Sequence, residues 1–244
     1  MNKGIYTIEK NINIARDTCL MVLSGDTSAL TAPGQFINIA LDSHYLRRPI
    51  SVCDYSDSDI TIIYKIVGEG TDQMSTMKEN ETLDVLVGLG NGFDTSKSGD
   101  KPVLIGGGVG LPPMYKLCKK LLAEGKKPSV IMGFASECDV FFKEEFKALG
   151  VAVTVCTMDG SCGICGFVTT ALKDKTDYTY YYTCGPEAML KAVYDTAKTE
   201  GQLSFEERMG CGFGACMGCS CETKYGSKRI CRDGPVLLSK EVIW

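Results

Sequence analysis

The chain has 244 residues, 44% of them hydrophobic and 23% charged, which fits one large or two ordinary globular domains. Its net charge of −4 argues against a nucleic-acid partner, and no apolar run reaches the roughly 18 residues of a membrane span. The N-terminus lacks a signal-peptide pattern, so we expect a cytoplasmic protein whose 13 cysteines serve cofactor binding rather than disulfides. The single histidine, His44, argues against histidine-based metal or triad chemistry.

Residues 5–89 have the pattern of short strands separated by turns. Apolar and polar residues alternate in 19–23, 35–40, 60–66 and 82–87, and turn residues fill 24–26, 32–34, 54–59 and 68–70. Several short strands at this spacing favour an antiparallel barrel or sandwich. We therefore predict a β domain over residues 1–95, followed by a polar linker at 94–101.

The first candidate site in this domain is the segment Arg48–Ser51. Pro49 biases the residue before it towards an extended backbone, and Arg48 and Ser51 lie three positions apart. A cation and a hydroxyl presented in this way suit an anionic, hydrogen-bonding cofactor. An adjacent pair of arginines, here Arg47 and Arg48, is also common on a solvated surface, so the segment alone leaves both interpretations open.

The second candidate site is the segment Gly68–Met77, which predicts a short helix with Thr71 as its N-cap. A helix entered through glycines offers free N–H groups to a phosphate. The alternative is an ordinary helix that closes one end of the barrel. Met74 and Met77 recur at helical spacing and are expected in the core rather than as ligands.

A different architecture begins at residue 101. A short strand over 103–105 runs into a glycine loop, and the prolines at 112 and 113 suit the first turn of a helix. The loop glycines are Gly106, Gly107, Gly108 and Gly110. This is a strand–glycine–helix pattern typical of phosphate binding, although Leu111 replaces the last glycine of the dinucleotide fingerprint. The alternative is a glycine-rich turn that serves only close helix–strand packing.

Strands and helices then alternate to about residue 203. Strands are predicted at 130–134, 151–155 and 178–183, with a helix carrying Phe142, Phe146 and Leu149 and another from 187 to 198. Such alternation predicts a parallel sheet with ligands at the carboxyl ends of its strands. A second glycine loop, Cys184-Gly185-Pro186, follows one of these ends. The sulfur of Cys184 either faces a nicotinamide or is a small buried thiol.

The choice of nicotinamide cofactor depends on the residues after two of these strands. Glu137 and Asp139 follow one strand and Asp159 follows the next, where a 2′-phosphate would require an arginine. These carboxylates favour NAD(H) over NADP(H). The nearby pair Cys162 and Cys165 has no second cysteine pair beside it, so we interpret it as incidental.

The most specific pattern lies near the end of the chain. Cys211, Cys216, Cys219 and Cys231 are spaced C-x4-C-x2-C-x11-C, and the first three match the plant-type spacing for a [2Fe–2S] cluster. Gly212, Gly214 and Gly218 are expected to allow the positive φ values that a tight loop requires. The alternatives are an all-thiolate zinc site and coincidence in a cysteine-rich chain. Cys221 fits no ligand position and is interpreted as a spare thiol.

The order of these motifs resembles that of the ferredoxin–NADP reductase superfamily. Within it, the segments Arg47–Ser51, Gly106–Pro113, Glu207–Cys216 and Cys231–Pro235 resemble the electron-transfer subunits of NAD-dependent (class 1B) dihydroorotate dehydrogenases. The resemblance covers essentially the whole chain. It implies a β + α/β fold: an FAD-binding antiparallel β-barrel over 1–95, an NAD-binding parallel-sheet domain over 101–203 and a [2Fe–2S] module over 204–244. The run 161–165 departs from the family pattern and leaves a local thiol role open.

The resemblance also implies site residues. FAD is expected on Arg48, Pro49, Ile50 and Ser51, on Ile63, Tyr64 and Lys65, and on Gly70 and Thr71. NAD(H) is expected on Gly106, Gly107, Gly108, Gly110, Cys184, Gly185 and Pro186. The cluster is expected on Cys211, Cys216, Cys219 and Cys231, and no acid–base catalytic residue is required.

The resemblance finally implies an electron relay. NADH gives a hydride to FAD, the flavin passes single electrons to the cluster, and the cluster exchanges them with the FMN of a partner catalytic subunit that oxidises dihydroorotate to orotate. The physiological net flow is from dihydroorotate to NAD+, in a hetero-oligomer expected to be a heterotetramer. The rival interpretations are a relay subunit of another NAD(P)H oxidoreductase, such as a ferredoxin:NADP or sulfur-metabolism reductase, and a non-enzymatic zinc-bound interaction module.

Overall fold

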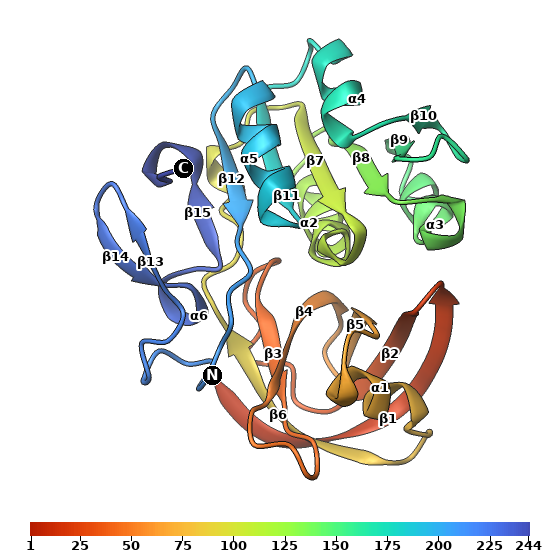
Figure 1. Cartoon of the computed structure of the whole chain (residues 1–244), viewed down its shortest axis with the longest axis vertical. Coiled ribbons are helices and arrows are strands. Elements are labelled where there is room, and N and C mark those ends of the chain that lie inside the picture. Colours follow the sequence, from red (N-terminus) through yellow and green to blue (C-terminus); the bar gives the residue numbers. More distant parts are fainter.

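The computed structural model describes all 244 residues, and its first part is a closed antiparallel barrel (Figure 1). Its strands are β1 (Asn2–Ala15), β2 (Thr18–Ser24), β3 (Phe36–Ile39), β4 (Arg48–Tyr55), β5 (Asp59–Lys65) and β6 (Thr82–Leu89), in the order β1-β2-β5-β4-β3-β6. Alternate side chains such as Ile8, Met21 and Ile37 are completely buried inside the barrel, because successive residues of a strand face opposite sides. The predicted β domain is therefore confirmed as a barrel.

The two interruptions predicted in the barrel have different structures. The segment Arg48–Ser51 is the beginning of strand β4, which pairs with β3. Gly68–Met77 does contain a short helix, α1 (Glu69–Thr76), but its N-cap is Gly68 and not Thr71. The hydroxyl of Thr71, one turn further in, accepts from the N–H groups of Val67 and Gly68 and donates to the carbonyl of Gly68. The side chain of Thr71 thus stabilises the helix start from within.

The second part is a seven-stranded sheet in the order β10-β9-β8-β7-β11-β12-β15. Its strands are β7 (Pro102–Gly107), β8 (Ser129–Phe134), β9 (Ala152–Thr157), β10 (Ile164–Cys165), β11 (Tyr180–Cys184), β12 (Gly201–Ser204) and β15 (Val236–Leu238). All neighbouring pairs are parallel except β12 with β15. The predicted parallel sheet is confirmed, while β10, β12 and the antiparallel β15 were not predicted.

Four helices cover the two faces of this sheet (Figure 1). They are α2 (Pro112–Ala123), α3 (Lys143–Ala148), α4 (Val168–Asp174) and α5 (Glu187–Thr196). Residues of α2 and α3 share one buried cluster and residues of α4 and α5 share another, so each pair lies on its own face. The helix predicted to carry Phe142 begins one residue later, because Phe142 adopts a left-handed backbone with φ of 60°.

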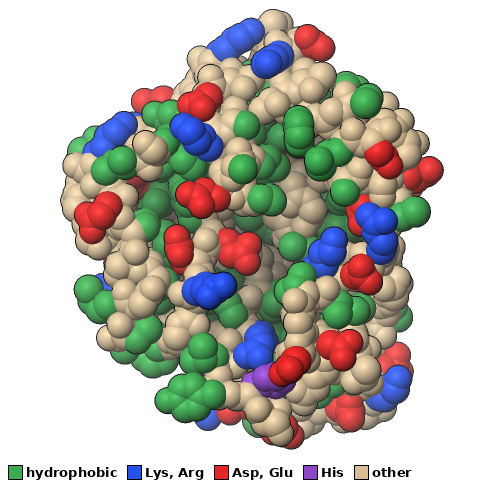
Figure 2. Space-filling model, in the orientation of Figure 1, with side chains coloured by type: hydrophobic (Ala, Val, Ile, Leu, Met, Phe, Trp, Pro, Cys, Tyr) green, Lys and Arg blue, Asp and Glu red, His purple; other side chains and the backbone are tan.

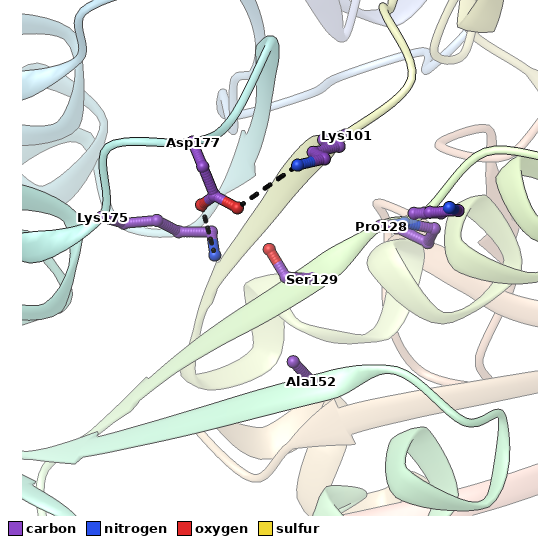
Figure 3. A pocket seen from close by; sticks show the side chains of 7 residues that line it. Lys101, Pro128, Ser129, Ala152, Lys175 and Asp177 are labelled. Carbon is purple, nitrogen blue, oxygen red and sulfur yellow. Dashed lines mark ion pairs between the residues drawn. The ribbon is translucent and has the colours of Figure 1, made fainter.

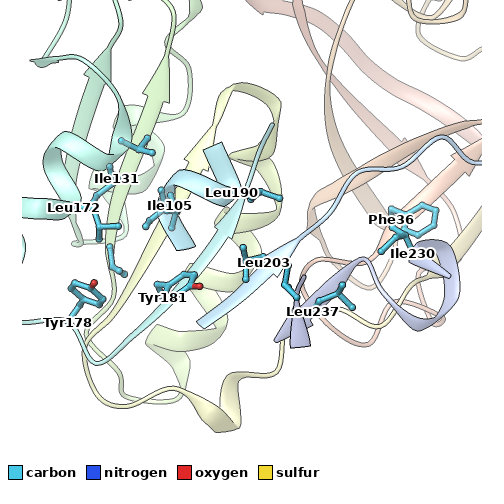
Figure 4. Packing of buried hydrophobic residues seen from close by; sticks show 14 of the residues in the cluster. Phe36, Ile105, Ile131, Leu172, Tyr178, Tyr181, Leu190, Leu203, Ile230 and Leu237 are labelled. Carbon is cyan, nitrogen blue, oxygen red and sulfur yellow. The ribbon is translucent and has the colours of Figure 1, made fainter. Parts of the chain in front are cut away.

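The C-terminal segment leaves the sheet after β12 and returns to it as β15. Between these strands lie the cysteine loop, the hairpin β13 (Ser220–Thr223) and β14 (Gly226–Arg229), and the one-turn helix α6 (Ile230–Asp233). Figure 4 shows the buried side chains that run from Leu203 through Leu237 to Ile230 and Phe36. The cysteine loop is therefore anchored to both the sheet and the barrel. The division into 1–95, 101–203 and 204–244 stays our proposal.

Two sets of ion pairs hold the barrel against the sheet. Asp54 of β4 accepts from Lys116 and Lys119 of α2, at 2.9 and 2.6 Å. Arg16, at the end of β1, donates through Nε to Asp139 after β8, at 3.0 Å. Since β4 begins with the flavin candidate and α2 follows the glycine loop, the first set fixes the two cofactor segments relative to each other.

The surface carries no dominant charge on the face shown in Figure 2. Basic and acidic side chains are interspersed there among apolar ones, as the net charge of −4 suggests. None of the helices has both the length and the apolar character needed to cross a bilayer.

The Arg16–Asp139 pair predicts a pH-dependent contribution to stability. Burial alone would raise the pKa of Asp139, but hydrogen bonds from Ser136 and Arg16 outweigh it and lower the pKa. A lowered carboxyl pKa stabilises the fold above the ordinary value of about 3.9, and this contribution is lost as the pH falls below it. We expect Asp139→Asn to reduce the free energy of unfolding by about 1 kcal/mol at pH 7, after allowance for solvent screening.

Urea unfolding at pH 7 and at pH 3.5 to 4 tests this prediction, and the difference between the two proteins should shrink at the lower pH. Asp177→Asn is the matched control, because Asp177 also pairs with lysines but is well exposed. A destabilisation by Asp139→Asn that grew on acidification would contradict the assigned sign.

Candidate functional site

The flavin candidates Arg48 and Gly70 lie against each other although they come from different elements. A Cβ atom on Gly70, in the first turn of α1, would overlap the guanidinium group of Arg48 at the start of β4. Nη2 of this guanidinium also lies 2.8 Å from Nδ1 of His44. A cation thus lies at the N-terminal end of a helix, where both its charge and the free N–H groups favour a phosphate.

Strand β5 offers fewer side chains to the expected flavin site than the sequence suggests. The side chain of Tyr64 is 2% exposed and lies in the barrel core, where its hydroxyl donates to Oδ1 of Asn11 at 3.0 Å. Burial raises the pKa of this phenol. Only the backbone of Tyr64 is therefore available to a flavin. Ile63 is buried between barrel and sheet, and Lys65 is half-buried at the end of β5.

The two glycine loops of the sheet lie side by side at the carboxyl ends of β7 and β11. Gly106 and Cys184 are register partners in these adjacent strands. A Cβ atom on Gly110 would overlap the carbonyl of Cys184, and one on Gly185 would approach the backbone nitrogen of Gly107 to 3.2 Å. The glycines therefore serve close backbone approach between the loops. The predicted nucleotide loops are brought together at the edge where parallel sheets bind ligands.

Cys184 lies at the junction of these loops and is a neutral thiol. Its side chain is partly exposed at the end of β11, but the sulfur is surrounded by protein, and this burial raises its pKa to about 12. A thiol with such a pKa is a poor nucleophile at neutral pH. Its position beside the glycine loops fits a small uncharged group next to a bound nicotinamide.

The three carboxylates predicted to select NAD(H) have separate roles. Asp139 accepts from Arg16 and Ser136, so its carboxylate is engaged within the protein. Asp159 accepts from the backbone N–H and the hydroxyl of Ser161, at 3.0 and 2.6 Å, and stabilises its own turn. The carboxylate of Glu137 is exposed and has no hydrogen-bond partner in the structure. Glu137 is the remaining candidate.

The four candidate cluster ligands come together in two pairs. The backbone N–H groups of Cys211 and Cys216 each point to the sulfur of the other, both at 3.4 Å. The N–H of Cys231 points to the sulfur of Cys219, also at 3.4 Å. No three of the chain's His, Cys, Asp or Glu side chains converge as ligands of one metal ion do. Two pairs of thiols suit two iron atoms better than one zinc ion.

The backbone of the loop points its N–H groups at the sulfurs. Ala215 donates to Sγ of Cys211 at 3.2 Å, and Gly218 donates to Sγ of Cys216 at 3.4 Å. Gly212 and Gly214 have φ of 78° and 90°, as predicted, but Gly218 does not; Met217 takes the left-handed conformation instead, with φ of 62°. The N–H groups provide the donors that a buried, negatively charged iron–sulfur cluster requires.

The acidity of these thiols also fits ligation. Burial disfavours the thiolate of Cys211, but N–H groups including those of Cys216 and Phe213 outweigh it and lower the pKa to about 6. For Cys231 the pKa rises to about 12, through burial and the neighbouring sulfur of Cys219. Four adjacent thiols cannot all ionise without a compensating cation, and the irons of a cluster supply that charge.

Cys231 lies on helix α6, which directly follows strand β14. Arg229, the last residue of β14, donates to the carbonyl of Gly214 at 2.9 Å and to Asp233 at 3.1 Å through Nε. This arginine ties the ligand loop to the helix that carries the fourth cysteine. The sequence does not predict this contact, because a basic residue in a polar hairpin carries no local signal of it.

The remaining cysteines belong to no group of three potential metal ligands. Cys221 lies on β13 beside the loop, partly buried, and burial raises the pKa of its thiol. Cys162 and Cys165 lie at the far edge of the sheet beside β10, where Cys165 is exposed. Cys221 lies near Cys219, but no hydrogen bond joins Cys162, Cys165 or Cys221 to the four candidate ligands.

A basic pocket of about 260 Å³ lies at the opposite end of the sheet from the glycine loops (Figure 3). It is lined by Lys101, Lys127, Pro128, Ser129, Ala152, Lys175 and Asp177. Asp177 forms ion pairs with Lys101 and Lys175 across it, at 3.8 and 3.5 Å. Because it lies at the amino ends of the strands, this pocket is separate from the cofactor segments.

Comparisons with protein families match two segments of the chain. Residues 206–243 match the iron–sulfur cluster binding domain of dihydroorotate dehydrogenase B, and residues 104–195 match the oxidoreductase NAD-binding domain. These matches confirm the nature predicted for the cysteine loop and for the sheet. They also decide against a zinc-bound interaction module.

Solved structures share the arrangement over all or most of the chain. The structure of an NADH-dependent reduced ferredoxin–NADP oxidoreductase, described for flavin-based electron bifurcation, has a TM-score of 0.90 at 28% identity and covers 99% of this chain and 90% of its own. A ferredoxin–NADP+ reductase from Neisseria gonorrhoeae with bound FAD and NADP has a TM-score of 0.68 at 17% identity, over 80% of this chain and 90% of its own. The second likeness shows the shared fold.

Curated relatives are similar over their full length. The dihydroorotate dehydrogenase B (NAD(+)) electron transfer subunit of Fusobacterium nucleatum is 41% identical over 251 residues, covering 97% of this chain and 96% of the relative. The subunit of the same name from Shouchella clausii is 40% identical, covering 99% and 98%. The chain therefore belongs to the family of electron-transfer subunits of NAD(+)-dependent dihydroorotate dehydrogenase B.

Proposed function

We propose that this chain relays electrons between NAD(H), FAD and a [2Fe–2S] cluster, to or from the FMN of a dihydroorotate dehydrogenase catalytic subunit. The observation that carries the proposal is the gathering of Cys211, Cys216, Cys219 and Cys231 into two thiol pairs under backbone N–H groups. FAD supplies the chemistry that connects two-electron hydride transfer with the one-electron steps of the cluster.

The side chains of the protein hold and orient these groups. Arg48 and the start of α1 bind the FAD pyrophosphate, with Pro49, Ile50 and Ser51 along the flavin and the backbone at 63–65 beside it. Gly106, Gly107, Gly108 and Gly110 and the Cys184–Pro186 loop admit NAD(H) at the end of the sheet. The ion pairs of Asp54 with α2 fix these two segments relative to each other. No acid–base residue is required.

The proposal requires a partner, since it assigns the oxidation of dihydroorotate to the FMN of a separate catalytic subunit. We place the FMN in that catalytic subunit and expect a heterotetramer built on a dimer of it. Cytoplasmic residence is part of the proposal, and it is supported by 13 cysteines that are all unpaired by disulfides.

The test is reconstitution without oxygen. The purified chain should carry FAD, iron and sulfide, and NADH should bleach its flavin in the absence of a partner. Addition of dihydroorotate should bleach it only when the FMN-containing catalytic subunit is present. A loaded complex that NADH reduces but dihydroorotate does not would overturn the assignment of the substrate.

A second candidate function is a relay subunit of another NAD(P)H oxidoreductase. It is favoured by the structural likeness to the NADH-dependent reduced ferredoxin–NADP oxidoreductase, with its TM-score of 0.90. Such a relay would pass electrons from NADH to a ferredoxin or another acceptor chain, and would not respond to dihydroorotate with any dihydroorotate dehydrogenase subunit. The same reconstitution therefore distinguishes the two.

We expect the carboxylate of Glu137 to determine the preference for NADH over NADPH. Since Asp139 and Asp159 are occupied by protein partners, Glu137 is the carboxylate free to accept from a ribose hydroxyl and to repel a 2′-phosphate. We expect Glu137→Gln to narrow the preference for NADH over NADPH by about tenfold, a change of about 1.4 kcal/mol. The measurement is the rate of flavin reduction by each nucleotide, and Asp159→Asn is the control that should leave the ratio unchanged. An unaltered ratio in Glu137→Gln would contradict the assignment.

A further inference from the structure

Asn38 connects the flavin strand with the cluster loop. Its neighbours on β3, Ile37 and Ile39, point into the barrel, so the side chain of Asn38 points outward, towards the C-terminal segment. There its Nδ2 donates to the carbonyl of Cys211 at 3.4 Å. Within the barrel, Asn38 pairs with Pro49 of the neighbouring strand β4. Partners in an antiparallel pair have Cα atoms about 5 Å apart.

The contact between Asn38 and the loop is close. Asn38 is only 1% exposed. A Cβ atom on Gly212, the residue after Cys211, would overlap Nδ2 of Asn38. The loop therefore approaches β3 at a position where only glycine fits, and where its φ of 78° also favours glycine. The close approach puts a candidate cluster ligand next to the flavin strand.

The other half of the amide is unusual. Oδ1 of Asn38 is buried and has no hydrogen-bond partner. A buried acceptor without a donor costs about 1–3 kcal/mol, so an asparagine in this place is unfavourable for folding alone. Leucine, of similar size, would avoid that cost. The amide, whose Nδ2 contacts the loop, therefore indicates a role in the arrangement of the loop.

We propose that Asn38 is a positioning residue that fixes the cluster at its working distance from the flavin. Through Nδ2 it holds the carbonyl of Cys211, and through the β3–β4 pairing it is joined to the segment Arg48–Ser51. The inference rests on the proposed roles of that segment in FAD binding and of Cys211 as a ligand. Residues behind the ligands of a metal site commonly change affinity or activity by about 10- to 100-fold when replaced.

The experiment compares Asn38→Leu with the wild-type chain in the loaded complex with its catalytic subunit. FAD, iron and sulfide are measured first, and both proteins should contain them. The rate of electron transfer from reduced flavin to the cluster should then fall about tenfold or more in the variant. The electron paramagnetic resonance spectrum of the reduced cluster should change as well, because the donor that holds Cys211 is gone.

Asn91→Ala is the matched control. Asn91 is also an asparagine of the barrel side that holds the C-terminal segment, through Nδ2 to the carbonyl of Val236 at 2.8 Å and through Oδ1 from its N–H at 3.1 Å. It contacts the segment beyond the ligands and does not touch Cys211. Its loss should lower the unfolding temperature but leave the transfer rate and the cluster spectrum as in the wild type.

Gly212→Ala provides a second variant if Asn38→Leu does not fold. Its added Cβ would displace the same amide from the other side, and it should slow the transfer in the same way. Equal slowing by Asn91→Ala, or a wild-type rate and spectrum in both Asn38→Leu and Gly212→Ala, would overturn the inference. Absence of iron or FAD from the wild-type chain would instead overturn the proposed function.

Discussion

Replacing Cys219 with serine is expected to remove the iron–sulfur cluster while FAD stays bound. Cys219 is 2% exposed and its sulfur accepts from the N–H of Cys231. It therefore belongs to the more buried of the two thiol pairs. A serine hydroxyl is a harder and much less acidic ligand than a thiol, and it matches iron in a cluster poorly. The barrel on which we propose that FAD binds is built from residues 2–89 and does not depend on this ligand.

Cys221→Ser is the matched control for this change. Cys221 lies two residues away on β13, and no N–H···S hydrogen bond joins it to any of the four candidate ligands. Visible absorbance, with iron and sulfide analysis of protein purified without oxygen, measures both variants. We expect less than about a tenth of the wild-type iron in Cys219→Ser, in line with the 10- to 100-fold effects seen at metal sites. Loss of iron from Cys221→Ser with retention in Cys219→Ser would show that the ligand set is wrong.

Replacing Arg48 with alanine is expected to weaken FAD binding about 10- to 100-fold. The guanidinium of Arg48 packs on Gly70 at the start of α1, where the pyrophosphate is proposed to bind. Hydrogen bonds to charged groups contribute about 1.5–3 kcal/mol each, which corresponds to this range of affinity. The cluster should remain, because its ligands are held by β15, α6 and β3. The purified variant should therefore be brown with little yellow flavin absorbance.

Arg47→Ala separates this effect from a general loss of positive charge. Arg47 donates to the carboxylate of Asp84 at 2.9 Å and to backbone carbonyls, so its charge is used within the barrel. Fluorescence titration of the apoprotein with FAD measures the dissociation constant of each variant. Equal weakening in Arg47→Ala and Arg48→Ala would mean that the arginine at 48 has no specific contact with the phosphates.

Local patterns in the sequence were sufficient for the main features of the chain. Alternating residues predicted the barrel strands, because burial of one face of a strand imposes a period of two. The glycine loop at 106–110 and the cysteine spacing at 211–219 are short segments whose conformation depends on their own backbone freedom. The proline at the start of α2 likewise carries its signal within one turn.

The sequence by itself thus determined the order of barrel, sheet and cysteine loop, and the chemistry that each is able to hold. Only the tertiary structure decided which polar groups remain free for that chemistry. Asp139 is occupied by Arg16, 123 positions away, Tyr64 faces Asn11 inside the barrel, and Asn38 meets Cys211 from 173 positions away. Such pairings arise from packing between elements distant in the chain, and the residues around each partner carry no signal of the other.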